Sequence, residues 1–307
     1  MTTPASPLLV RPGAVAGLGV DAGVADHYGD PLREQRTALT QPAVVDRSHR
    51  GVVRVSGPDR LSWLHSLTSQ HLTELPTGRW TEALVLSPHG HVEHHLTLVD
   101  DGESTWMHVE PGTAPALVGY LDSMRFMLRV EVADVSTAYG VLSRITGDAD
   151  VVDELVTRDS IADAADATGL PLVGHGAFEA LRVAAGHPRL GFETDHRTIP
   201  HEVGWIGPAV HLEKGCYRGQ ETVARVHNLG RPPRRLVLLH LDGTQDNLPA
   251  PHTPVDLEDR AVGFLGTAVH HADLGPIALA VVKRQTADDA HLTVAGMAAK
   301  ADRLVDA

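Results

Sequence analysis

The chain has 307 residues, of which 42% are hydrophobic and 21% are charged, as expected for a globular protein with a large core. Acidic residues outnumber basic ones by 39 to 26, and the net charge of −13 disfavours general nucleic-acid binding, which needs many cations. The single cysteine excludes an intramolecular disulfide and a self-contained four-thiolate iron–sulfur cluster. We see no signal peptide in residues 1–10 and no apolar run near the ~20 residues of a membrane span, so we expect a cytoplasmic protein without a membrane partner.

The first part of the chain alternates strand and helix patterns. After an irregular entry, residues 31–38 are typical of a short helix that begins with proline. Periodicity then predicts these elements: a strand at 51–55, a helix at 60–72, strands at 80–86, 91–99 and 105–109, a helix at 113–127 and a strand at 128–135. That order predicts a ferredoxin-like α+β unit with one extra strand.

In the rest of the chain, the pattern changes from a mixture of helices and strands to short strands. We expect a strand at 141–145 and helices at 150–155 and 178–185, the last ended by Gly186. Short β runs follow at 236–241, 262–269, 277–283 and 291–294, with turn residues between them. These runs predict a small C-terminal β-barrel or sandwich of about 70 residues.

Residues 214–221 (Lys-Gly-Cys-Tyr-Arg-Gly-Gln-Glu) hold the only cysteine, Cys216. Lys214 and Arg218 stand two positions to either side, and a short helix pattern follows, with Gly230 as its cap. Nearby cations and a helix N-terminus lower a thiol pKa and favour the nucleophilic thiolate. The alternative is that Cys216 is a small buried hydrophobe, as lone cysteines often are.

Two other groups of polar residues can carry chemistry. On a strand, His91, Glu93 and His95 share one face near His89 and His94, which suits either a metal or a solvated strand face. A helix and its following loops deliver Arg182, Glu193 and Glu202, which are either functional residues or structural ion pairs. A local basic patch is also visible in the sequence, at Arg225, Arg231, Arg234 and Arg235.

Five segments together resemble the YgfZ-type folate-binding proteins, which are relatives of the glycine-cleavage T-protein (aminomethyltransferase). The segments are Asp46-Arg47-Ser48, residues 55–60, residues 179–188, Ile199-Pro200-His201-Glu202 and residues 214–221. The resemblance covers nearly the whole chain in order. It implies an α+β, three-domain T-protein-like ring, made of two α+β domains with a ferredoxin-like core and a C-terminal β-barrel. We assign these domains to 1–50 with 137–233, to 51–136 and to 234–307.

The resemblance also implies a tetrahydrofolate-type ligand in a central channel. A carboxylate suits the N–H edge of a pterin, and arginine suits the anionic glutamyl tail. We expect Glu193 or Glu202 to bind the pterin and Arg182 or Arg225 to bind the tail. Tyr217, Gly219, Gln220 and Glu221 of the motif are expected beside this ligand.

The sequence departs from the T-protein pattern at two places. The T-protein segment Gly-Gly-x-x-Asp-Asp-Leu resembles residues 90–96 here, where His94 and His95 replace both aspartates. The T-protein's pterin-binding glutamate corresponds to Ala184, and Cys216 stands where the T-protein has no thiol. These departures argue against ordinary aminomethyl transfer.

We therefore expect a folate-binding accessory protein for the synthesis, maturation or repair of iron–sulfur proteins. Cys216 would handle sulfur or a transient cluster bond, assisted by Lys214 and Arg218, with iron–sulfur enzymes or cluster-assembly proteins as partners.

A folate-dependent one-carbon transfer enzyme with His94 or His95 as base is the alternative. A third reading is a role in tRNA modification, acting through iron–sulfur enzymes and not by direct RNA contact. No metal site is assigned.

Overall fold

The computed structural model describes residues 3–147, 150–245 and 247–304. The chain divides into two compact units. The first comprises Met1–Val85, His94–Phe178 and Ala209–Tyr217, and the second comprises Leu86–Glu93, Glu179–Pro208 and Arg218–Ala307. The three-domain assignment from the sequence stays a prediction.

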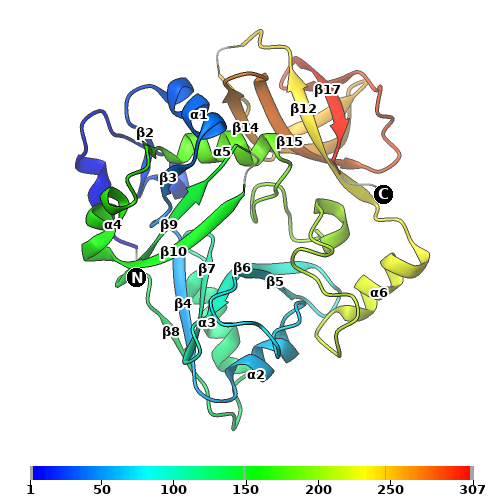
Figure 1. The fold of residues 1–307 in the computed structure, drawn as a ribbon. Helices are drawn as coiled ribbons and strands as arrows, with labels where there is room; N and C mark the ends of the chain where they lie inside the picture. Colours follow the sequence, from blue (N-terminus) through cyan, green and yellow to red (C-terminus); the bar gives the residue numbers. More distant parts are fainter. Residues whose placement is uncertain (1–2, 148–149, 246, 305–307) are drawn as a thin grey trace. The chain divides into compact units, whose positions relative to one another are not determined.

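A five-stranded sheet contains β4 (Gly51–Ser56), β5 (Thr81–Leu86), β6 (Val92–Asp100), β7 (Ser104–Val109) and β8 (Glu131–Asp134). Its strand order is β5-β6-β7-β4-β8 (Figure 1). This is the expected ferredoxin-like arrangement with β5 as the extra edge strand. The sheet packs against α2 (Arg60–Leu67) and α3 (Ala114–Ser123) through a core that includes Trp63, Leu64, Leu117, Leu121 and Met107.

Both helices are shorter than their sequence patterns predict. The helix expected over 60–72 ends at Leu67, because the Ser69 N–H leaves the helix and donates to the Leu84 carbonyl in β5. The helix expected over 113–127 ends at Ser123, and two tight turns follow before Phe126 takes a left-handed φ of 47° and Leu128 is reached. The following strand, expected over 128–135, is correspondingly shortened to Glu131–Asp134.

A second sheet in the first unit has the order β10-β9-β3-β11, from β10 (Val151–Thr157), β9 (Tyr139–Ile145), β3 (Ala43–Asp46) and β11 (Leu172–Val173). The prediction of a helix over 150–155 is therefore wrong. Val151, Val152, Val156 and Thr157 are β-branched and pair with β9 along the whole strand, so cross-strand packing outweighs helix propensity. Around this sheet lie α1 (Pro31–Thr40), α4 (Ile161–Ala167), the strand pair β1 (Val15–Ala16) and β2 (Ala25–His27), and the 3₁₀ turns η1 (Pro7–Val10), η2 (Gly19–Asp21) and η3 (Arg158–Ser160).

The second unit contains a closed six-stranded barrel with the order β12-β15-β14-β13-β16-β17. Its strands are β12 (Arg234–Leu241), β13 (Pro254–Leu257), β14 (Arg260–His271), β15 (Gly275–Lys283), β16 (Leu292–Val294) and β17 (Met297–Arg303). Alternate residues such as Val237, Leu239 and Leu241 point into the barrel core. The barrel is confirmed, but β13 and β17 were missed, because β13 begins with proline and β17 is rich in alanine and charge.

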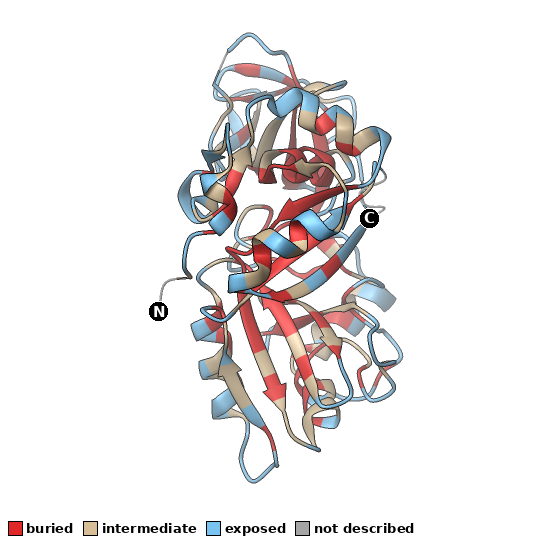
Figure 2. Cartoon of the chain, turned by 60° about the vertical axis from the view of Figure 1, so that its left-hand side comes forward, coloured by how far each residue is buried: buried red, intermediate tan, exposed pale blue. Residues whose placement is uncertain are grey.

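Three further elements complete the chain: α5 (His175–Ala184), η4 (Pro200–Val203) and α6 (Gln220–Leu229). Helix α6 ends at Gly230, as predicted, although this glycine is extended at φ −122° and not left-handed. Figure 2 shows buried residues along the strands of the sheets, whereas the helices carry broad exposed faces. Among the described residues, we find no helix with the length and apolar character that a bilayer crossing requires.

Candidate functional site

The Cys216 thiol lies on an exposed loop that is held on both sides. Gly215 and Cys216 are exposed, whereas the flanking Lys214 and Tyr217 are each only 9% exposed. The Lys214 ammonium also lies 4.8 Å from the centre of the Tyr217 ring, a cation–π contact. The thiol is therefore presented to solvent by two buried neighbours, and it is not the packed hydrophobe of the alternative reading.

Lys214 is anchored at the end of α2. Its Nζ donates to the carbonyls of His65 and Thr68, the latter at 2.5 Å. Carbonyls at a helix C-terminus attract cations, since they have no partner within the helix. Burial lowers the pKa of Lys214 to about 8, so the ammonium is still mostly protonated at neutral pH. Its charge thus secures the loop to α2.

The boundary between the two units falls between Tyr217 and Arg218. Arg218 forms an ion pair with Glu93 at 3.1 Å, and both side chains are about a third exposed. Gly219 has a φ of 83°, and a Cβ there would lie 2.5 Å from the Ser87 carbonyl oxygen. The positive φ and the close approach to the Ser87 carbonyl therefore explain why a glycine occupies position 219.

Helix α6 carries the last two residues of the predicted motif, Gln220 and Glu221, and the predicted tail-binding residue Arg225. Glu221 and Arg225 are exposed and stand one turn apart on α6, while Gln220, its first residue, is half-buried. A ligand can reach the Arg225 guanidinium and the Glu221 carboxylate in this arrangement.

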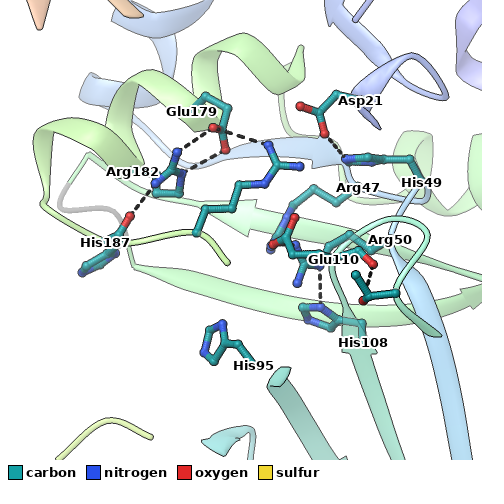
Figure 3. Close-up of polar contacts among 12 residues, drawn as sticks. Asp21, Arg47, His49, Arg50, His95, His108, Glu110, Glu179, Arg182 and His187 are labelled. Carbon is teal, nitrogen blue, oxygen red and sulfur yellow. Dashed lines mark hydrogen bonds and ion pairs between the residues drawn. The ribbon is translucent and has the colours of Figure 1, made fainter. Parts of the chain in front are cut away.

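Arg182 lies in a buried ion-pair cluster at the end of α5 (Figure 3). Its Nε and Nη2 donate to Glu179, at 3.0 and 2.7 Å, and Nη1 contacts Glu193 at 3.2 Å. The remaining contacts go to the His187 carbonyl and the Thr267 hydroxyl. Burial opposes the charge, but the two carboxylates outweigh it and raise the pKa of Arg182. These contacts account for all five N–H donors of the guanidinium.

Glu193 connects this cluster to the barrel by hydrogen bonds. It is fully buried and accepts from the backbone N–H groups of Arg189, at 2.7 Å, and Thr267, at 2.6 Å. A Cβ on Gly266 would lie 2.4 Å from the Glu193 Oε1, so only glycine allows the approach.

Glu202 lies in a second buried network with Arg234. The Arg234 guanidinium donates to both Glu202 oxygens, at 2.9 and 2.8 Å, and to both Asp195 oxygens, at 3.0 and 2.7 Å. Glu202 also accepts from the Ile199 N–H at 3.1 Å. Burial alone would raise the pKa of Asp195, but Arg234 and the neighbouring N–H groups outweigh it and lower that pKa. Glu202 is only 1% exposed, and its hydrogen bonds stabilise the chain around η4.

Side chains of the histidine-rich strand form pairs with residues outside this strand. The His95 Nε2 contacts Glu82 at 2.8 Å, and Glu93 pairs with Arg218. Burial lowers the pKa of His94, which favours its neutral imidazole. The metal reading of this strand, with His89 and His91, receives no support from these contacts.

Two clusters were not predicted from the sequence. Asp21, His49 and His175 converge, with one ligand atom from each within 4.8 Å of the others. The His49 Nε2 lies 3.0 Å from Asp21, a contact drawn in Figure 3. The second is a buried network of Arg47, Arg50, His108, Glu110 and Asp153. Their residues come from separate segments of the chain, among them strands, turns and the start of α5, so only the assembled fold brings them together.

Comparison with known proteins agrees with this architecture. Residues 25–158 match the GCVT N-terminal domain, and residues 234–304 match the C-terminal β-barrel domain of CAF17. The chain thus contains a segment similar to the GCVT N-terminal domain, followed by a segment similar to the CAF17 C-terminal barrel. It is 29% identical over 230 residues to an iron–sulfur cluster assembly factor IBA57 homologue, mitochondrial, of Mycosarcoma maydis, covering 64% of this chain and 57% of that protein.

Two other proteins are similar to this chain, one in sequence and one in fold. The tRNA-modifying protein YgfZ of Colwellia psychrerythraea is 27% identical over 162 residues, covering 50% of this chain and 47% of that protein. The crystal structure of the glycine cleavage system aminomethyltransferase T from Bartonella henselae superposes with a TM-score of 0.82 at 16% identity, covering 97% of this chain and 95% of that one. The fold is therefore T-protein-like, with mixed α+β sheets and a closed C-terminal barrel.

Proposed function

We propose that this chain is a folate-binding accessory protein for the assembly or repair of iron–sulfur proteins. The observation that carries the proposal is the exposed Cys216 thiol, on a loop held by the buried Lys214 and Tyr217. The IBA57 and YgfZ relatives support it, since their names refer to iron–sulfur cluster assembly and tRNA modification. A role in tRNA modification would be indirect, because a net charge of −13 disfavours RNA binding.

The chemistry follows from having one accessible thiol per chain. A thiolate sulfur binds iron or attacks a sulfur–sulfur bond, and both reactions need access from solvent. Clusters of the usual type take four thiolates, so Cys216 can hold one only together with ligands from a partner. The proposed partners are therefore iron–sulfur enzymes or cluster-assembly proteins.

The predicted ligand residues differ in how well they fit tetrahydrofolate, which would supply a reduced pterin and an anionic glutamyl tail. Arg182, Glu193 and Glu202 fit poorly, because they are buried and hydrogen-bonded within the protein. Arg225 and Glu221 fit better, since both are exposed on α6. We propose that Arg225 binds the tail carboxylates and that the buried residues hold the surrounding backbone.

Calorimetry tests the ligand and the residue proposed to bind its tail. Tetrahydrofolate should bind saturably, and Arg225→Gln should weaken binding by about tenfold. Arg197→Gln removes an exposed charge elsewhere and is the matched control. Absence of saturable binding would remove the folate part of the proposal, and unchanged affinity in Arg225→Gln would remove the proposed role of Arg225.

One-carbon transfer is a second candidate, favoured by the neutral state of His94. A neutral imidazole can accept a proton, so His94 could replace the aspartate base that this chain lacks. Tetrahydrofolate-dependent turnover of an aminomethyl donor, lost in His94→Gln, would support the enzyme. Folate binding without turnover would favour the accessory role.

A further inference from the structure

A strongly basic cavity lies at one end of the C-terminal barrel. It has a volume of about 650 Å³, and five cationic residues line it: Arg231, Arg235, Lys283, Arg284 and Arg303. They meet because β12 pairs with β15 and β17, with Arg235 opposite Val282 and Arg303 opposite Val237. This concentration is unusual in a chain whose net charge is −13.

Two arginines that line the cavity carry buried hydrogen-bond donors without an acceptor among the described residues. Arg235 is 1% exposed; its Nη2 donates to the Thr286 carbonyl at 2.7 Å and pairs with Asp288 at 2.5 Å. Its Nε and Nη1 are buried without a partner among the described residues, and so is the Nε of Arg284. Buried donors are nearly always paired in native proteins, because an unpaired donor loses its hydrogen bonds to water without replacement. At the wall of this cavity, the N–H groups of Arg235 and Arg284 thus have unused hydrogen-bonding capacity among the described residues.

The positive charges of the cavity are only partly neutralised. Asp288 is the carboxylate that pairs with both Arg235 and Arg303, the latter at 3.1 Å. Among the described residues, the five cations that line the cavity and the Asp288 carboxylate sum to a local charge of about +4. Burial and then the nearby Arg231, Arg303 and Arg235 lower the pKa of Arg284, as expected for cations held together without enough counter-charge.

We propose that this cavity binds a compact oligophosphate group, that is, a diphosphate or a triphosphate. Guanidinium groups match phosphate oxygens through paired hydrogen bonds, and several arginines around one concave site favour a ligand with several charges close together. A nucleic acid would need a longer basic track, and a chain of carboxylates spreads its charges over a greater length. The unpaired donors of Arg235 and Arg284 fit the oxygens of such a group.

Isothermal titration of the full chain tests the proposal with chosen probes. Tripolyphosphate and pyrophosphate should bind saturably, more tightly than orthophosphate, and more weakly as salt is added. Binding of ATP as tight as that of tripolyphosphate would identify nucleotides as a source, whereas weaker ATP binding would favour the free anion. A tri-γ-glutamate peptide that binds more tightly than tripolyphosphate would overturn the assignment to oligophosphate, and so would the lack of saturable binding.

Substitutions at the cavity distinguish a ligand site from a structural charge cluster. Arg284→Gln should weaken tripolyphosphate binding by at least about tenfold, Arg284→Lys by less, and Arg197→Gln should have little effect. Because Arg284 repels its neighbours, Arg284→Gln should leave the unliganded protein equally or more heat-stable. Unchanged affinity in Arg284→Gln would contradict the proposal. These results are independent of tetrahydrofolate binding and of Cys216.

Discussion

At Lys214 the positive charge is directed toward the end of α2. The sequence suggested that Lys214 and Arg218 act together on the thiol, because both lie two positions from Cys216. In the structure each has another partner, the carbonyls of His65 and Thr68 for Lys214 and the Glu93 carboxylate for Arg218. An assisting role for either cation toward Cys216 stays a prediction. Spacing along the chain could not reveal these partners, which come from distant segments.

His108 shows the same dependence on assembled structure. It is fully buried between two partners: its Nδ1 accepts from the Arg50 Nε at 2.7 Å, so its Nε2 donates to Asp153 at 2.8 Å. Burial lowers the pKa of His108 to about 4, and nearby Arg50 and Arg47 act in the same direction, although Asp153 opposes them. The neutral tautomer is thereby fixed.

This arrangement predicts a stability that falls with acid. The unfolded chain binds a proton near the ordinary value of 6.5 and the folded one only near 4, so the free energy of unfolding should decrease as pH falls through that window. His201, whose pKa burial also lowers to about 4, should act in the same direction. His108→Gln should cost about 1–3 kcal/mol at neutral pH and flatten the pH dependence in urea unfolding. If the free energy of unfolding of His108→Gln depended on pH as in the native protein, the lowered pKa of His108 would not be the cause of the pH dependence.

At the scale of elements, local patterns located most helices and strands but not their ends. The turn after β4, the helix–sheet alternation and the barrel texture were predicted, since apolar spacing and turn residues report on local structure. Strand β10 was misassigned, because only its partner β9 shows that its valines pack in a sheet. Strand β17 was missed for the same reason, as its alanines gain their burial from the closed barrel.

The start of α6 depends on one backbone conformation. Gly219 combines a positive φ with close approach to Ser87 and Gly90. Gly219→Ala should therefore destabilise the protein by about 1–3 kcal/mol, measured as the midpoint of thermal or urea unfolding. Gly215→Ala is the matched control, because a Cβ there meets no atom within 4 Å; it should change stability by no more than about 0.5 kcal/mol. Equal effects of the two substitutions would show that the strain at Gly219 is not the cause.

At the scale of the whole molecule, the resemblance in five short segments anticipated the fold. The GCVT and CAF17 matches and the T-protein structure agree with it over nearly the full chain. The site was anticipated less well. Arg182 draws its contacts from residues as far as 85 positions away, so its structural role could not be inferred from the sequence. Cys216 is the predicted nucleophile, and the structure places it on an exposed loop.

The central claim is that this thiol serves iron–sulfur proteins. Its most direct test is the activity of iron–sulfur enzymes in cells that lack the chromosomal copy and carry the native protein, Cys216→Ser or Gly215→Ala at equal expression. Cys216 is exposed, so Cys216→Ser should fold normally. We predict that the native protein and Gly215→Ala restore enzyme activity and that Cys216→Ser does not. Full restoration by Cys216→Ser would contradict the claim.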